Sequence, residues 1–139
     1  MTSASVKPIL RDSTEKKITR RKGGRYEKYN LIQRIKKTSG IFQKRHAEFY
    51  DIELVGDVRT KGMVMGIELV QNRAKKTPLQ LKKSINKIVF DIGRKNHIFF
   101  RTLGNIIMLV PPLVISEKEL NFLIDGTLKT INDISKVVR

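Results

Sequence analysis

The 139-residue sequence has no cysteine, few acidic residues and no long apolar run. Without cysteine there are no disulfides, zinc-thiolate sites or thiol nucleophiles, which fits a reducing compartment. The longest apolar run, Ile106 to Val110, ends at two prolines and is far too short to cross a bilayer. The N-terminus has no apolar core like that of a secretion signal. We therefore expect a soluble, cytoplasmic protein with no structural metal.

The shortage of acidic residues leaves a net charge of +16 at pH 7. Such a charge suggests a polyanionic partner, either nucleic acid or a membrane surface. However, residues 1–53 and residues 54–139 each carry an excess of eight positive charges, so neither part is singled out. The densest cluster, Lys16 to Arg25, has no interleaved aromatic residues on which bases could stack. A solvated arm is therefore the simpler interpretation of this cluster. A small basic nucleic-acid-binding module stays open as an alternative function of the chain.

Three segments have the pattern of helices. From Tyr26 to Phe49 the apolar residues fall roughly on one helical face, although Gly40 in its interior could divide the element. Thr77 and Pro78 have the form of an N-cap and a first helical residue, and Asn96 is suited to the left-handed end of that helix. The segment Ser116-Glu-Lys-Glu is a capping box that predicts a final helix with an apolar stripe.

Two strand pairs are predicted between these helices. Residues 54–70 show the two-residue period of a strand covered on one face, and a turn at Thr60-Lys61-Gly62 predicts an antiparallel hairpin. Ile98 to Arg101 and Ile106 to Val110 predict a second pair, joined through Gly104 and ended by two prolines. The expected fold class is therefore a two-layer α/β fold, a small four-stranded and mainly antiparallel sheet with helices packed on it.

The domain organisation follows from the same patterns. Residues 1–25 mix Ser, Thr, Lys and Arg without a helical or strand period, so we expect a basic, disordered tail. Residues 26–139 are expected to form one domain, which is the usual number for this length.

Few residues suggest small-molecule chemistry. His46 and His97 are isolated, and neither has a partner at metal-ligand spacing. Arg101 stands at the end of a predicted strand beside the second hairpin turn. An arginine at such a place is most often only solvated, but its guanidinium presents two parallel donors that match a carboxylate.

Several of these motifs, in this order, resemble one known family. They are Val55-Gly-Asp-Val-Arg, then Gly62-Met-Val-Met-Gly-Ile-Glu-Leu-Val, then Phe100-Arg-Thr-Leu-Gly-Asn-Ile-Ile-Met-Leu-Val-Pro-Pro and the Ser116 capping box. Over about residues 27–136 the sequence resembles the C-terminal small domain of class III pyridoxal-phosphate aminotransferases, nearest to the branch that acts in biotin synthesis. The resemblance implies a fold-type I subdomain that closes over an active site built mainly by a preceding large domain.

The resemblance also implies roles for particular residues. Arg101 stands where the family has an arginine that pairs with the substrate carboxylate, while Thr102 departs from the proline that usually follows it. Arg59, Asp57 and Gly104 are implied as support for the turns or the domain interface.

The same resemblance implies that pyridoxal 5'-phosphate is held by the large domain, because no lysine of this sequence stands in a matching context. The chain alone is thus expected to lack catalytic and cofactor-binding residues and to be inactive. Its implied partners are the missing large domain or a homodimer partner, together with an amino-acid or oxo-acid substrate. The sequence does not decide whether the chain comes from a truncated or remnant gene, is a split subunit, or is an expressed piece of a longer chain.

Overall fold

The computed structural model describes residues 30–138. The predicted tail at residues 1–25 lies outside this range. The chain divides into two compact units, Met1–Arg34 and Ile35–Arg139. Only residues 30–34 of the first unit are described, and they contain the beginning of helix α2. The remaining description concerns the second unit.

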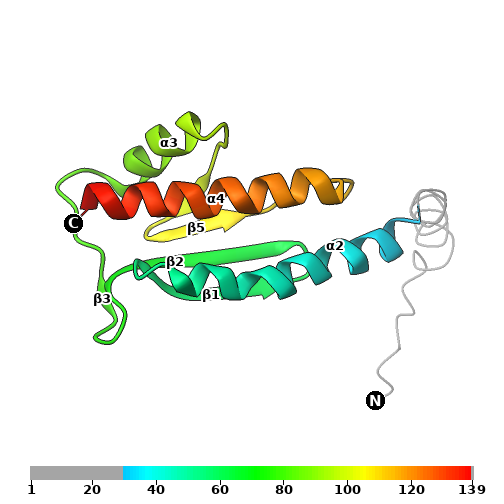
Figure 1. Cartoon of the computed structure of the whole chain (residues 1–139), viewed down its shortest axis with the longest axis horizontal. Helices are drawn as coiled ribbons and strands as arrows, with labels where there is room; N and C mark the ends of the chain where they lie inside the picture. Colours follow the sequence, from blue (N-terminus) through cyan, green and yellow to red (C-terminus); the bar gives the residue numbers. More distant parts are fainter. Residues whose placement is uncertain (1–29, 139) are drawn as a thin grey trace, which may run out of the picture. The chain divides into compact units, whose positions relative to one another are not determined.

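The elements alternate between helices and antiparallel strand pairs (Figure 1). The main sheet has the strand order β1-β2-β5-β4, and a short fifth strand, β3, pairs with the end of β2. In chain order the elements are α2 (Leu31–Arg45), the 3-10 helix η1 (His46–Asp51), β1 (Val55–Lys61), β2 (Val64–Asn72), β3 (Thr77–Pro78), α3 (Ile85–Lys95), β4 (Arg101–Leu103), β5 (Ile106–Leu109) and α4 (Glu117–Val138).

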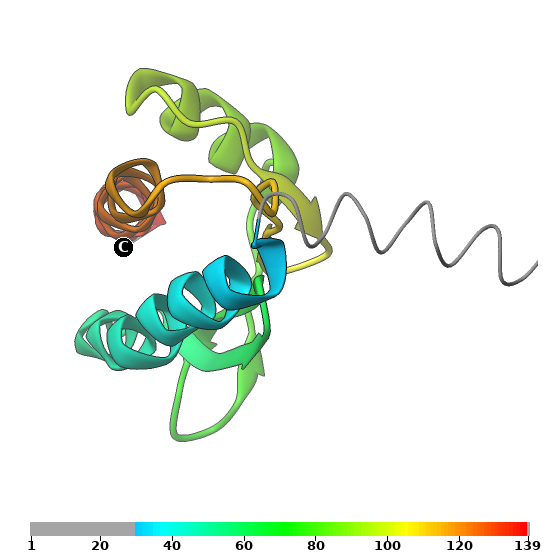
Figure 2. The ribbon, with the colours of Figure 1, turned by 90° about the vertical axis from the view of Figure 1, so that its right-hand side faces the viewer.

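The three helices α2, α3 and α4 cover the same face of the sheet (Figure 2). Between the two layers lies the core, which contains Phe42 of α2, Val89 of α3 and Ile124 of α4, all fully buried. The sheet contributes alternate residues to this core, such as Met65 and Ile107. No described helix covers the opposite side of the sheet, which we call the open face. None of the described helices is long and apolar enough to span a membrane.

The two-layer α/β fold class predicted from the sequence is confirmed, and the structure adds β3 to the four expected strands. The capping box of the last helix is also present, because the amide of Glu119 donates to Ser116 Oγ at 3.2 Å and the amide of Ser116 donates to Glu119 Oε2 at 2.9 Å. Gly40 does not interrupt α2, which runs unbroken to Arg45 before the chain tightens into η1.

Three local predictions were wrong. The first strand of the second pair was expected at Ile98 to Arg101, but β4 runs from Arg101 to Leu103, so Arg101 begins the strand instead of ending it. Thr77 and Pro78 do not start a helix: they form β3 beside β2, and α3 begins only at Ile85, after Ser84. Proline fits there because an edge strand does not need its missing amide donor. Asn96 is not left-handed, since its φ is −94°, and the next residue, His97, takes the positive φ of 63° instead.

Candidate functional site

Arg101 lies on the open face at the start of β4, the edge strand of the sheet, with its side chain exposed. It pairs with Met108 of β5, and the next open-face pair along the two strands joins Leu103 to Ile106. The side chain of Leu103 is 69% exposed. The guanidinium therefore emerges beside apolar side chains, an arrangement that suits a carboxylate carried on an aliphatic chain.

The pairing of the strands places a second arginine in line with Arg101. Arg59 of β1 is opposite Gly66 of β2, Gly66 is opposite Met108, and Met108 is opposite Arg101. Directly paired residues of antiparallel strands project from the same face. The open face thus has a cation at each end of one row, with a glycine and a methionine between them.

A shallow hollow of about 450 Å³ lies over this part of the open face. Its floor is formed by Gly66 with the apolar side chains of Val64, Ile106 and Met108, and its β1 side carries Arg59. A β-carbon placed on Gly66 would stand 3.6 Å from Ile106 and 3.7 Å from Met108, which is ordinary van der Waals contact. The hollow is deeper because Gly66 has no side chain, and a methyl group at this position would fit without a clash inside the chain.

Asp57 holds Arg59 at the edge of this hollow. The Nε of Arg59 donates to Asp57 Oδ2 at 2.7 Å, and the hydroxyl of Tyr50 donates to Asp57 Oδ1 at 3.0 Å. Mainly through the hydrogen bond from Arg59, the pKa of Asp57 lies below its usual value, and the same bond raises the pKa of Arg59. Asp57 therefore stays ionised near neutral pH and fixes one side of the Arg59 guanidinium.

The turn that follows Arg101 is held from two directions. Gly104 adopts a φ of +58°, the left-handed backbone that a two-residue hairpin turn needs at its first position. Asn105 donates through Nδ2 to the carbonyl of Leu69 at 2.9 Å, while the Leu69 amide donates to the Asn105 carbonyl at 2.8 Å. The hairpin carrying Arg101 is thereby anchored to β2 at the centre of the sheet.

The structure also shows contacts near Arg101 that the sequence did not reveal. The hydroxyl of Thr102 donates to the side-chain carbonyl of Asn86, in the first turn of α3. Nothing in the local pattern around Asn86 indicates a partner on β4, because the two residues meet only when α3 packs against the sheet.

The two histidines do not form a site with Arg101. His46 Nδ1, at the start of η1, lies 2.6 Å from the carbonyl of Gln43 in the last turn of α2, and His97 is exposed just beyond the end of α3. Within residues 30–138 no group of three potential ligands could hold a metal ion.

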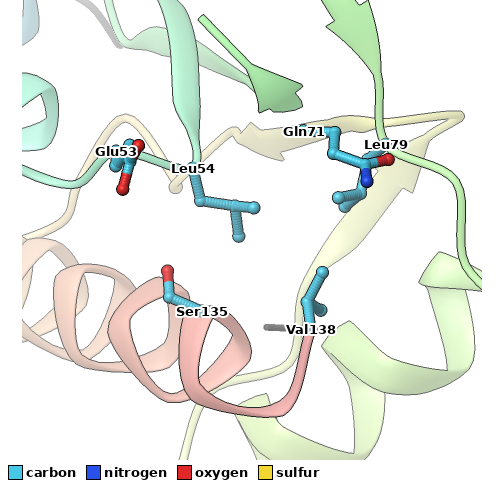
Figure 3. Close-up of a pocket in the computed structure, with 6 residues that line it drawn as sticks. All are labelled: Glu53, Leu54, Gln71, Leu79, Ser135 and Val138. Carbon is cyan, nitrogen blue, oxygen red and sulfur yellow. The ribbon is translucent and has the colours of Figure 1, made fainter.

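A second cavity, of about 240 Å³, lies near the C-terminal end of α4 (Figure 3). Its lining carries one carboxylate and no cation, so it does not suit an anionic ligand. None of its lining residues belongs to β4 or β5, and Figure 3 labels Glu53, Leu54, Gln71, Leu79, Ser135 and Val138 around it.

The comparisons with known proteins identify the family. Residues 25–131 match the family described as aminotransferase class-III. The chain belongs to this family. Class III aminotransferases depend on pyridoxal 5'-phosphate.

Relatives within the family bear one recurrent name. The chain is 34% identical over 110 residues to a Geobacter sulfurreducens protein named adenosylmethionine-8-amino-7-oxononanoate aminotransferase, a match covering 79% of this chain and 24% of that protein. It is 36% identical over 108 residues to the protein of the same name from Methanocaldococcus jannaschii, with 78% and 23% covered.

Solved structures agree with the sequence relatives. The crystal structure of the Methanocaldococcus jannaschii aminotransferase matches with a TM-score of 0.72 over 78% of this chain and 25% of that one. A transaminase structure with L-alanine, 25% identical, matches with a TM-score of 0.74 over 82% and 27%. The chain therefore spans about a quarter of the length of the relatives it matches.

The described residues do not form a pocket for the family's cofactor. A lysine that holds pyridoxal phosphate must lose its proton, which burial or a neighbouring cation favours. Every lysine in residues 30–138 is exposed, including Lys61 at the open-face hollow, so burial does not favour the neutral form of any of them. What this part of the chain presents is an exposed guanidinium, Arg101, on a sheet face that no described helix covers.

Proposed function

We propose that this chain is the C-terminal part of an adenosylmethionine-8-amino-7-oxononanoate aminotransferase of biotin synthesis, which transfers an amino group to an oxo acid. The observation that carries the proposal is that two relatives with this name are 34% and 36% identical to the chain over 110 and 108 residues. Those relatives offer no support for the nucleic-acid alternative.

In this proposal Arg101 binds the carboxylate of the oxo acid. Its guanidinium is exposed and can present two parallel N–H donors to one carboxylate. The neighbouring Leu103 and Met108 provide apolar contact for the chain that carries this carboxylate. The arrangement favours an aliphatic oxo acid over a small polar one.

The reactive group is supplied from outside residues 30–138. Pyridoxal phosphate, when bound, withdraws electrons from the reacting carbon. The residues described here bind and orient the substrate and exclude water from one side of it. The chain is thus expected to be inactive alone and active with a cofactor-bearing domain, which we place against the open face because the helices already cover the other face.

Complementation tests this proposal. The Methanocaldococcus jannaschii relative would be truncated by the C-terminal quarter that this chain matches, then mixed with this chain. We expect neither piece to transfer amino groups alone and the mixture to do so. The proposal is contradicted if the mixture stays inactive while the relative's own missing quarter restores activity to the same truncated protein.

The role of Arg101 is tested in that mixture. Arg101→Ala should raise KM for 8-amino-7-oxononanoate roughly 10- to 100-fold, because a charge-assisted pair contributes about 1.5–3 kcal/mol, with a smaller change in kcat. Arg94→Ala, on the exposed side of α3, is the matched control and should leave KM unchanged. An unchanged KM for Arg101→Ala would show that the carboxylate binds elsewhere.

The position of the cofactor-bearing domain has its own test. Gly66→Ala fits inside this chain, so its thermal unfolding should match the wild type, but the new methyl group fills the hollow of the open face. We expect complementation to need a several-fold higher concentration of the partner domain. If Gly66→Ala complements at the wild-type concentration, the domain does not pack over the hollow.

A further inference from the structure

The strand that carries Arg101 is held by backbone hydrogen bonds on one side only. β4 has three residues and is an edge strand, so it has a neighbouring strand, β5, on one side only. Edge strands bend and twist more easily than central ones because half of their backbone groups have no partner in the sheet. Beyond its backbone bonds to β5, the orientation of the strand and of the Arg101 side chain depends on what contacts its other side.

The register of β4 and β5 shows whether the backbone of Thr102 bonds to the sheet. A two-residue turn at Gly104 and Asn105 makes Leu103 and Ile106 the hydrogen-bonded pair nearest the turn. Hydrogen-bonded and non-hydrogen-bonded pairs alternate, so Thr102 and Ile107 form a non-hydrogen-bonded pair. The amide and carbonyl of Thr102 point away from β5, and its backbone does not attach β4 to the sheet.

The backbones of Arg101 and Leu103 bond to β5, and the side chain of Thr102 adds an attachment to the helix layer. It lies on the helix side of the sheet, half-buried, and its hydroxyl donates to the side-chain carbonyl of Asn86. Within residues 30–138 this is the only side-chain hydrogen bond made by β4.

Helix α3 is itself firmly seated, so Asn86 is a fixed point. At the other end of the helix, Asn96 donates through Nδ2 to Thr130 Oγ1 at 3.1 Å and to Asp133 Oδ2 at 3.2 Å on α4. Gly93 lets the helix approach so closely that a β-carbon there would stand 2.6 Å from the ring of Phe100. The bond from Thr102 thus connects β4 to a helix that is held by the core.

We infer that Thr102 and Asn86 form a positioning pair that sets the direction of Arg101, an inference that rests on the proposed carboxylate-binding role of that arginine. The guanidinium of an extended arginine lies roughly 6–7 Å from its Cα, so a strand rotation of about 10° moves it by about 1 Å, enough to weaken a directed contact.

The experiment uses the full chain and needs no cofactor. Backbone ¹⁵N order parameters report how rigidly residues 101–103 are held, and the shift of the Arg101 Nε–H signal on titration with heptanoate reports carboxylate binding. Thr102→Val removes the hydroxyl at nearly constant shape, Asn86→Ala removes the acceptor, and Thr102→Ser keeps the donor. Thr127→Val, which removes a buried hydroxyl bonded within α4, is the matched control.

We expect Thr102→Val and Asn86→Ala to lower the order parameters of β4 and to weaken heptanoate binding about five-fold, the change expected for one lost hydrogen bond. Thr102→Ser should stay within about two-fold of the wild type, and Thr127→Val should leave Arg101 unchanged.

Wild-type order and affinity in both Thr102→Val and Asn86→Ala would overturn the inference, and so would an equal loss in Thr127→Val. A wild-type chain whose Arg101 does not respond to heptanoate, while the order parameters still fall in Thr102→Val, would instead contradict the proposed function of Arg101 and leave the pair as a strand anchor.

Discussion

At the scale of single residues, the arginines of this chain differ in what surrounds them. Arg101 is exposed and available to a ligand, whereas Arg73 is used within the fold. Its guanidinium donates to the carbonyls of Val55, Tyr50 and Ile52 at 2.7–2.8 Å and lies 5.8 Å from the centre of the Tyr50 ring. Sequence alone gives both residues the same chemistry, and only the tertiary structure shows that the guanidinium of Arg73 is bonded within the fold.

Arg73 is therefore predicted to matter for stability. Arg73→Ala should lower the free energy of unfolding by about 1–2 kcal/mol, because three carbonyls lose a charged donor at once. Arg73→Lys should recover less than half of this, since an ammonium cannot reproduce the planar fork. Urea unfolding of the chain measures both. Lys75→Ala, at a nearby exposed position, is the control, and an equal loss there would show a general effect of charge.

At the scale of elements, sequence pattern determined the type of most helices and strands but not all of their ends. Strong local signals, such as the capping box at Ser116, are satisfied within a few residues and could be predicted. The Thr77-Pro78 pair carries a signal that fits either a helix start or an edge strand, and pairing with β2 decides it. The end of α3 could not be predicted for the same reason. The side chain of Asn96 bonds to α4, and His97 rather than Asn96 takes the positive φ.

Substitution of glycine by alanine is expected to have opposite effects on stability in two helices, because their packing differs. A β-carbon added to Gly40 in α2 would meet no neighbouring atoms within 4 Å, so Gly40→Ala should stabilise the chain by about 0.5–1 kcal/mol. In α3, Gly93→Ala would place a methyl group 2.8 Å from the backbone oxygen of Ile98, and should destabilise by about 1–3 kcal/mol. Thermal unfolding of the two variants checks the opposite signs, and a loss in both would mean that Gly40 is packed.

At the scale of the whole folded unit, the sequence predicted a sheet covered on one face, and the structure agrees. The Arg101 row and the Thr102 contact could not be predicted, because they depend on register across four strands and on the seating of α3. Several carboxylates of the folded unit also accept hydrogen bonds, and this gives the unit a dependence on pH.

Four carboxyl groups have a pKa below the ordinary value of 3.8 for Asp or 4.5 for Glu, each because it accepts hydrogen bonds in the folded state. Glu48 accepts from Arg45, Asp57 from Arg59, Glu119 from the amide of Ser116 and Asp133 from Asn96. A lowered folded-state pKa stabilises the fold above the unfolded-state pKa, and this contribution is lost as pH falls through the folded-state value.

The melting temperature should thus be nearly constant from pH 7 to about pH 5 and fall increasingly below about pH 4. Asp57→Asn should lower it at pH 7 and make the acid decrease shallower, and Arg59→Ala should act in the same direction by removing the donor to Asp57. Circular dichroism melts across this range measure the effect. A melting temperature that rises on acidification would contradict the sign.

The arrangement of the strands has a consequence for how the chain reaches its native state. β1 and β2, and likewise β4 and β5, are neighbours in sequence as well as in space, and glycine turns at Gly62 and Gly104 align each pair. Among the strand pairings of residues 30–138, only that of β2 with β5, between residues 65–68 and residues 106–109, must be found over a long separation. Loop closure between the two hairpins is then the entropically demanding event of folding, and it brings α3 and α4 onto the core together with β5.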